Sequence, residues 1–174
     1  DWGQAESNAD LVAYVKRLIE LRAEHPALRR RRWLRGPDSP DGGDVAWWHP
    51  DGQPMTDDDW RVDGACWLGV LLDGSSIPER DRRGQPIVDD MLMALFDLGT
   101  EQVSWKLPQL DGRHSWQVLI DSGGDPTGSS PAPPDGEPQH TDLAAGSFVT
   151  DGRRVVLLAA VRSEIQRRCW PNRI

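Results

Sequence analysis

Cysteine is scarce in this sequence, which contains only Cys66 and Cys169 among 174 residues. Small disulfide-framework domains carry more cysteines in fewer residues, so we expect both thiols to be free, as in a reducing compartment. No apolar run approaches the roughly 18 to 20 residues that span a bilayer, and Asp1–Asn8 is neither basic nor apolar enough to act as a secretory signal. We therefore expect a cytoplasmic chain without a membrane segment.

Basic residues are outnumbered by acidic ones, 20 against 28, which gives a net charge of -8 and a sequence pI near 4.9. A nucleic-acid surface needs a basic footprint that releases counterions from phosphates, and the short run Arg29–Arg32 does not supply one. Nucleic acid is therefore not expected as a partner. Of the acids, 21 are Asp and 7 are Glu, which together with 17 Gly and 14 Pro indicates many turns and few helices.

The motifs of most enzyme classes are missing as well. The sequence has no Gly-rich phosphate loop with Lys, no G-x-S-x-G elbow, no H-E-x-x-H pair and no C-x-x-C. We therefore assign no catalytic residue, no metal ligand and no cofactor. The histidines are isolated beside turn residues or a helix end, which is typical of surface residues; they are His25, His49, His114 and His140.

Carboxylates cluster at Asp57–Asp59 and at Asp89–Asp90, and paired acids are what glycoside hydrolysis requires. However, adjacent residues on a strand point to opposite faces, and acids that follow a residue such as Thr56 commonly cap a helical turn. For Thr56–Asp59, a capping role or plain solvation is therefore favoured over catalysis. The segment 121–125 offers oxygen atoms to Ca²⁺ but lacks the full spacing of a calcium loop, which favours a plain turn.

One segment, Ala9–Glu24, has clear helical periodicity. Its apolar side chains follow the i, i+3, i+4, i+7 spacing of one helix face, and Pro26 disfavours helical geometry at the residue before it. The sequence contains no second helix of comparable quality to cover this face, which indicates a missing partner domain. In the chain alone we expect self-association through this face, unless the helix folds back onto the sandwich. The residues expected to form that interface are Leu11, Tyr14, Val15 and Leu18.

Beyond Trp33 the pattern changes to short apolar or alternating runs between turn signals, which is typical of strands. Asp111–Gly112 and Asp151–Gly152 are candidates for hairpin turns, and Ser122–Gln139, rich in Gly, Pro and Ser, is expected to be an exposed flexible loop. This punctuation favours an antiparallel β-sandwich or barrel over a parallel α/β sheet. The predicted strands are Asp44–His49, Trp67–Leu72, Met91–Phe96, Gln102–Leu107, Ser115–Ile120, Ser147–Thr150 and Arg153–Val161.

Tryptophan is abundant rather than scarce, with nine residues. Exposed indole rings stack on sugars, whereas buried ones fill a sandwich core or a domain interface, and the core or interface role is favoured. Successive strand residues point to opposite faces, so at most one of Trp47 and Trp48 belongs to the core. The candidates for contact with carbohydrate are Trp47, Trp48 and Trp60.

Four stretches carry a family resemblance. The sequences WHPDGQPMTDDDW at Trp48–Trp60, LGVLLDG at Leu68–Gly74 and IPERDRRG at Ile77–Gly84 lead into DDMLMALFD at Asp89–Asp97. The last of these ends in Asp97 where Asn is usual. In these motifs the chain resembles the C-terminal portion of bacterial glycogen debranching enzymes of the isoamylase type, and its first helix resembles the final helix of their barrel.

This resemblance covers Asp1–Ile120 well and Gly146–Arg162 loosely. It implies a large cytoplasmic glycoside hydrolase that cleaves α-1,6 branch linkages of glycogen or limit dextrin, with a (β/α)8 barrel followed by a β-sandwich. Residues 1–30 would then be a remnant of the barrel, 31–162 the β-sandwich, and 163–174 an atypical, poorly ordered tail. The family's catalytic carboxylates match no position here, so we expect the chain to be non-catalytic on its own.

Three functions stay open at this point. The preferred one is a non-catalytic C-terminal domain that stabilises the catalytic barrel of the parent enzyme. The second is an independent module that binds α-glucan through its exposed tryptophans. The third is a hydrolase that works through its aspartate clusters. In each case the expected fold is mainly β, an antiparallel sandwich preceded by one amphipathic helix.

Overall fold

The computed structural model describes residues 7–39, 43–123, 143 and 145–162. A helix and a short 3-10 turn come first, and strands follow. The elements are α2 (Ala9–Glu24), η1 (Pro26–Arg29), β1 (Val45–Trp48), η2 (Asp59–Arg61), β2 (Trp67–Leu72), η3 (Gly74–Ser76), β3 (Met91–Asp97), β4 (Val103–Lys106), β5 (His114–Asp121), β6 (Ser147–Thr150) and β7 (Arg154–Arg162).

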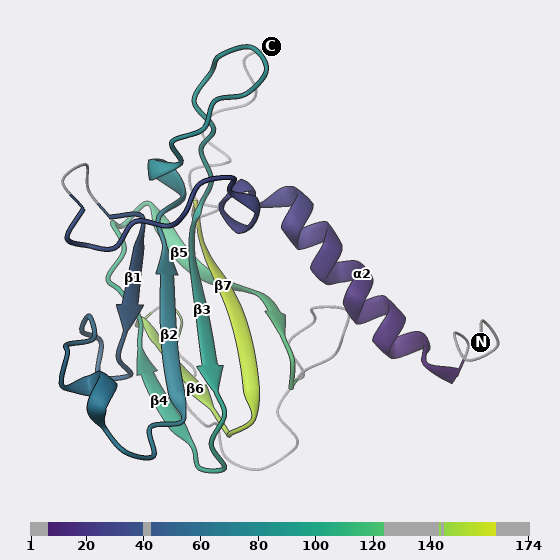
Figure 1. Ribbon diagram of the computed structural model, residues 1–174. Coiled ribbons are helices and arrows are strands. Elements are labelled where there is room, and N and C mark those ends of the chain that lie inside the picture. The colour runs from purple at the N-terminus through teal and green to yellow at the C-terminus, as the bar shows by residue number, and fades with distance from the viewer. Residues whose placement is uncertain (1–6, 40–42, 124–142, 144, 163–174) are drawn as a thin grey trace.

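The described strands form two antiparallel sheets. Five of them make one sheet in the order β1-β2-β3-β7-β5, and β4 pairs with β6 in a second, smaller sheet behind it (Figure 1). Each predicted strand is present within a few residues of its expected position, because alternation and turn residues mark strands well. The prediction of a mainly-β sandwich preceded by one helix is therefore confirmed.

The larger sheet has two apolar faces, and the strand register shows which residues lie on each. Leu95 lies opposite Val156 on the inner face, where the core also contains Trp105 and Phe148 from the smaller sheet. Residues at the alternate positions face outward, and part of that outer face packs against Ala27 of η1. The outer cluster consists of Ala27, Val45, Leu72, Ile77, Leu92 and Ala159.

The two predicted hairpin turns are wrong as hairpins. Asp111–Gly112 lies between β4 and β5, and Asp151–Gly152 lies between β6 and β7, but in both cases the flanking strands belong to different sheets. Local turn chemistry identified the change of direction correctly. It carries no information on which strand the chain pairs with next. The predicted loop Ser122–Gln139 lies almost entirely outside the described residues, as does the tail 163–174.

Helix α2 has the predicted bounds. Pro26 holds the preceding His25 in an extended conformation, with φ -105° and ψ 98°, and the His25 N–H closes the last turn on the carbonyl of Leu21. Leu21 is the buried residue of the helix. Among the described residues, no helix combines the length and the apolar character needed to cross a bilayer.

The glycines of the LGVLLDG motif have a packing role. A Cβ on Gly69 would lie 2.7 Å from the Cβ of Trp48, and a Cβ on Gly74 would overlap the carbonyl oxygen of Asp90. Gly69 therefore lets β1 and β2 approach around the Trp48 side chain. Gly74 lets the end of β2 pass directly over the residues that begin β3.

Charged side chains fix the segment that joins η1 to β1. Arg30, whose side chain is 4% exposed, pairs with the buried Asp44 at 2.8 Å. The Glu79 carboxylate accepts the backbone N–H groups of Arg31 and Arg32 at 2.9 and 3.0 Å. Burial by itself raises the pKa of Glu79, but these backbone hydrogen bonds and the nearby Arg30 charge outweigh it, so the pKa of Glu79 is lowered.

We expect Glu79→Gln to reduce stability at neutral pH and to have a smaller effect in acid. A lowered folded-state pKa means that the carboxylate stabilises the fold above its ordinary pKa and loses this contribution as the pH falls through the folded-state value. Urea midpoints of both proteins at pH 7 and in acid measure the difference. The exposed Asp63→Asn is the control. A gap between wild type and Glu79→Gln that widens in acid would contradict the assignment.

Candidate functional site

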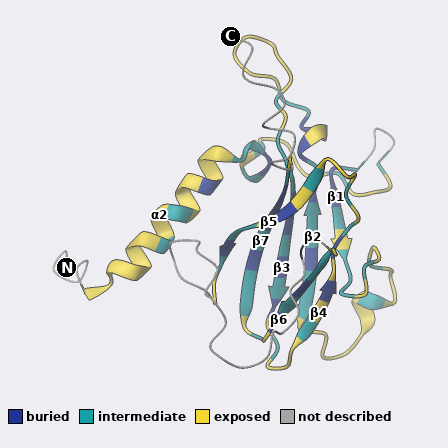
Figure 2. Ribbon diagram, turned by 180° about the vertical axis from the view of Figure 1, so that it is seen from behind, coloured by how far each residue is buried: buried dark blue, intermediate teal, exposed yellow. Residues whose placement is uncertain are grey.

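The apolar face of α2 lies open to solvent. Leu11, Val15 and Leu18 are 61, 45 and 41% exposed, and Figure 2 shows the helix exposed along most of its length. Tyr14 is half-buried, and its pKa is raised first by burial and then by the negative charge of Asp121. The predicted interface residues are thus largely uncovered in this chain, as expected of a helix that lacks its packing partner.

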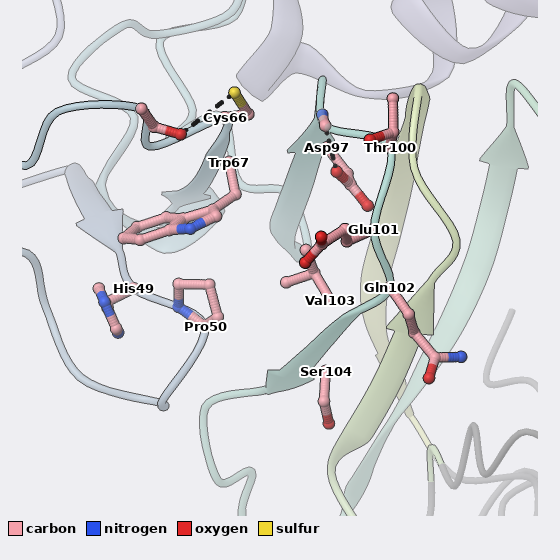
Figure 3. A pocket seen from close by; sticks show the side chains of 12 residues that line it. His49, Pro50, Cys66, Trp67, Asp97, Thr100, Glu101, Gln102, Val103 and Ser104 are labelled. Atoms are coloured by element: carbon pink, nitrogen blue, oxygen red, sulfur yellow. Dashed lines mark hydrogen bonds between the residues drawn. The ribbon is translucent and has the colours of Figure 1, made fainter.

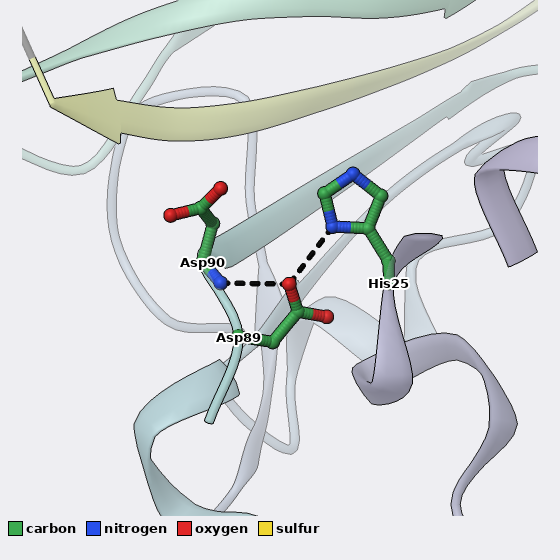
Figure 4. Close-up of side chains that lie close together, drawn as sticks. All are labelled: His25, Asp89 and Asp90. Carbon is green, nitrogen blue, oxygen red and sulfur yellow. Dashed lines mark hydrogen bonds and ion pairs between the residues drawn. The ribbon is translucent and has the colours of Figure 1, made fainter. Parts of the chain in front are cut away.

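The helix is attached to the sheet at its C-terminal end. The Nδ1 atom of His25 lies 2.9 Å from Oδ1 of Asp89 (Figure 4). The Ala27 N–H donates to Oδ2 of Asp89 at 2.9 Å. The His25 side chain is only 12% exposed, so its prediction as a surface residue is wrong. No local pattern predicts this contact, because 64 residues separate the two partners.

Asp90 lies next to this contact. Among the described residues, His25, Asp89 and Asp90 are the one group of three His, Cys, Asp or Glu side chains whose possible metal-ligand atoms all lie within 4.8 Å of one another. Both Asp89 oxygens are already engaged, since Oδ1 also accepts the N–H of Asp90 at 2.8 Å. The arrangement therefore acts as an anchor between α2 and β3. Asp89 thus has a structural role at the junction of the helix and the sheet.

A shallow hollow of about 400 Å³ lies over the exposed half of the outer sheet face. Trp47 and Trp60 meet beside it edge to face, with ring centroids 5.6 Å apart, and are 39 and 52% exposed. The lining is almost wholly apolar, and Asp59 is its one charged residue; the other residues are Met55, Trp60, Val62, Ala65, Cys66, Trp67, Leu68, Phe96 and Leu98. Such a surface suits contact with another apolar surface.

Trp48 points the other way. It packs against the inner core, and its indole Nε1 donates to the carbonyl of Lys106 at 2.9 Å. The expectation that at most one residue of the Trp47–Trp48 pair belongs to the core is confirmed. The structure therefore brings Trp47 and Trp60 together and places Trp48 away from them.

The acidic run Asp57–Asp59 leads into the short helical turn η2. Oδ2 of Asp59 accepts the Thr56 N–H at 2.7 Å and the Thr56 hydroxyl at 2.8 Å, and these bonds, the backbone one first, lower the pKa of Asp59. Asp58 pairs with Arg61 on the surface at 2.9 Å. The expected local role is therefore seen for Asp59, whereas Asp58, at the N-cap of η2, makes no side-chain capping hydrogen bond.

A second concavity, a groove of about 560 Å³, lies between β4 and the residues that follow β1 (Figure 3). His49 and Trp67 stand on one side of it, with the imidazole edge against the indole at a centroid distance of 4.4 Å. Glu101, Gln102 and Ser104 line the other side. Sequence reasoning missed this groove, because strand alternation predicts faces but not the space that two sheets leave between their edges.

Comparison with known proteins gives relatives that are all named for glycogen. The glycogen operon protein GlgX homolog of Mycobacterium tuberculosis is 33% identical over 131 residues, 74% of this chain and 18% of the relative. The glycogen debranching enzyme of Klebsiella pneumoniae is 41% identical over 73 residues, 42% of this chain and 10% of the relative, and that of Cronobacter sakazakii is 40% identical over 72 residues. No family model matches the chain.

This chain spans less than a fifth of the length of these relatives. Their names agree with the resemblance carried by the four motifs between Trp48 and Asp97. The matched stretches thus relate this chain to a portion of the GlgX/isoamylase-type glycogen debranching enzymes.

Proposed function

We propose that the chain serves as the non-catalytic C-terminal domain of a glycogen debranching enzyme and stabilises the catalytic barrel of that enzyme. The observation that carries the proposal is the uncovered apolar surface made by α2 and the open half of the outer sheet face. Leu18 and Trp47 represent its two parts, and both are about two-fifths exposed, 41 and 39%.

The two parts are connected through the outer face of the larger sheet, with β1 at one edge of the sheet and α2 projecting beyond the other (Figure 1). Residues of η1, which follows α2 directly, pack on the outer face of the larger sheet, so the helix emerges from the same face that carries Trp47. Figure 1 looks onto this face, and no described element crosses its lower half. A surface of this kind is costly in water and typical of an interface with a further body.

The lengths of the relatives indicate how large the missing partner of this surface is. They are more than five times as long as the stretch they share with this chain, which leaves room for a barrel with its own catalytic carboxylates. In this proposal residues 1–30 contribute the final barrel helix, residues 31–162 form the sandwich, and hydrolysis of α-1,6 branch linkages takes place outside the chain. The chain alone is then inactive on limit dextrin.

A graft into the relative from Mycobacterium tuberculosis tests the docking role. This chain replaces the matching segment of that protein, and Leu18→Lys is introduced into the graft. We expect Leu18→Lys to destabilise the graft by about 2 kcal/mol or more, because a leucine that is covered on docking is replaced by a charge. In the chain alone the same change costs less than about 0.5 kcal/mol, because Leu18 is exposed there.

Thermal unfolding and limit-dextrin hydrolysis are the two readouts for the graft. Gln85→Lys, at an exposed position in the turn between Glu79 and Ile87, is the matched control and should leave both unchanged. Equal tolerance of Leu18→Lys and Gln85→Lys in an active graft would contradict docking through α2. Release of reducing sugar by the isolated chain would show instead that catalytic groups lie within it.

The exposed pair Trp47 and Trp60 favours one alternative, a carbohydrate-binding β-sandwich module. Two indoles at 84° to each other offer an aromatic corner against which a sugar ring can stack. The hollow beside them has few polar groups to orient hydroxyls, however, which favours protein contact there.

A further inference from the structure

The groove between the two sheets has a different chemical character from the hollow beside Trp60. One wall is aromatic, formed by the half-buried Trp67 with His49 and Pro50 next to it, and the opposite side is polar. In Figure 3 the carboxylate of Glu101 extends from the β3–β4 turn toward the wall that carries Trp67. A concave site with one aromatic wall and a few polar groups is the usual form of a small-ligand site.

The edge of β4 adds backbone hydrogen-bonding groups to the groove. The Leu107 N–H donates to Gly146, so the antiparallel register directs the N–H and C=O of residues 103 and 105 toward β6. Those of Ser104 therefore point to the opposite side, the side on which the Lys106 N–H donates to Pro50 at 2.8 Å. Ser104 lines the groove and thus presents one donor and one acceptor to it.

This edge is too short for an added peptide strand. Lys106 is already bonded through its N–H to Pro50 and through its carbonyl to Trp48, which leaves the backbone of Ser104 alone between Lys106 and the turn. Strand addition depends on a run of main-chain hydrogen bonds. A ligand with scattered hydroxyl groups fits one backbone donor, one backbone acceptor and the nearby side chains better.

The charged residues of the groove restrict the chemical class of the ligand further. Its described lining contains no Lys or Arg, and Glu101 is exposed and free to accept hydrogen bonds from hydroxyls. The buried Asp97 in its floor is engaged by Thr150 and Gly152. An anionic ligand is disfavoured, whereas a neutral polyhydroxylated one can stack on the indole and donate to the carboxylate.

From these features we propose that the groove is a binding site for a short stretch of α-glucan, with Trp67 as the stacking wall and Glu101, Gln102 and Ser104 as hydrogen-bonding partners. The choice of α-glucan rests on the proposed function, since the relatives are named for glycogen. The site would hold a substrate chain at a distance from the catalytic carboxylates. It adjoins the outer hollow, because Cys66 and Trp67 line both, but its hydrogen-bonding residues Glu101, Gln102 and Ser104 belong to the groove and not to the hollow.

The test is a titration of the isotope-labelled 174-residue chain with maltoheptaose, followed through backbone amide and indole N–H resonances. We expect shifts at Gly99–Ser104, at His49 and at the Trp67 indole. Glu101→Ala should weaken binding about tenfold, because it removes a charge-assisted hydrogen bond. Trp60→Ala, on the outer hollow, is the matched control and should leave the affinity unchanged.

Three results would overturn the proposal: no shifts at millimolar maltoheptaose, shifts confined to the Trp47 and Trp60 indoles, or equal affinity for cellohexaose at the same amides. Glu101 and Trp60, the two residues that are replaced, are both exposed, and an unchanged melting temperature verifies that each variant is folded. The titration uses the chain by itself, so its outcome does not depend on docking. Loss of docking with Leu18→Lys and loss of glucan binding with Glu101→Ala are therefore separate failures.

Discussion

Replacing Asp97 with Ala is expected to destabilise the fold by about 3 to 5 kcal/mol. The Asp97 side chain is fully buried. Its Oδ2 accepts the Thr150 hydroxyl at 2.6 Å and the Gly152 N–H at 3.0 Å, and its Oδ1 accepts the Gly99 N–H at 3.2 Å. Thr150 in turn accepts the Trp105 indole N–H at 3.0 Å, so the change leaves several donors without partners in the core.

Asp97→Asn is the informative control, because Asn is the residue that the family resemblance leads one to expect at this position. Its amide oxygen can replace Oδ2 toward Thr150 and Gly152, while its NH₂ group faces the Gly99 N–H unfavourably. We expect a cost of about 1 to 2 kcal/mol, the loss of one such bond. Urea unfolding of both variants measures the difference. A cost below 1 kcal/mol for Asp97→Ala would show that water or backbone shifts satisfy the freed donors.

Gly74→Ala is expected to cost about 3 kcal/mol or more, because a methyl group there overlaps backbone atoms that cannot rotate away. The overlap is with the carbonyl groups of Asp89 and Asp90, at the start of β3. Displacing this segment also disturbs the contacts of Asp89 with His25 and Ala27 that hold α2. The loss should therefore appear as a lower melting temperature together with faster amide exchange at the end of the helix.

Gly112→Ala provides the comparison, since nothing lies within 4 Å of a Cβ built at that glycine. It should leave the melting temperature unchanged or raise it slightly, because Ala restricts the unfolded chain more than Gly does. Similar behaviour of Gly74→Ala and Gly112→Ala would mean that the β2–β3 connection adapts to the added methyl group. In that case the packing role given to this motif glycine would be wrong.

Local sequence signals were sufficient to predict the α-helix and the strands of this fold. Ala9–Glu24 has a regular 3.6-residue period and a proline after it, and the strands alternate between turn residues, so their positions follow from short-range chemistry. The exposure of the apolar helix face could also be predicted, because the rest of the sequence contains no second helix to cover it.

Contacts between residues far apart in the sequence could not be predicted from local patterns. The sheet change after Asp151–Gly152 and the contact of His25 with Asp89 both depend on residues far apart in the sequence. The groove beside Trp67 has the same origin, since it is bounded by two sheets whose relative placement no local pattern specifies. Trp60 was predicted as a candidate for contact with carbohydrate, which stays a prediction, and its pairing with Trp47 could be seen only in the structure.

The central position of β7 has a consequence for biosynthesis. β5 pairs with β7 and β4 pairs with β6, so residues 103–121 have no strand partner until residues 147–162 have been made. During translation the inner face of β1, β2 and β3 stays uncovered until β6 and β7 have left the ribosome. The sandwich therefore closes only after residues 147–162 have been synthesised, and nascent chains stalled before Ser147 should depend on chaperones to stay out of aggregates.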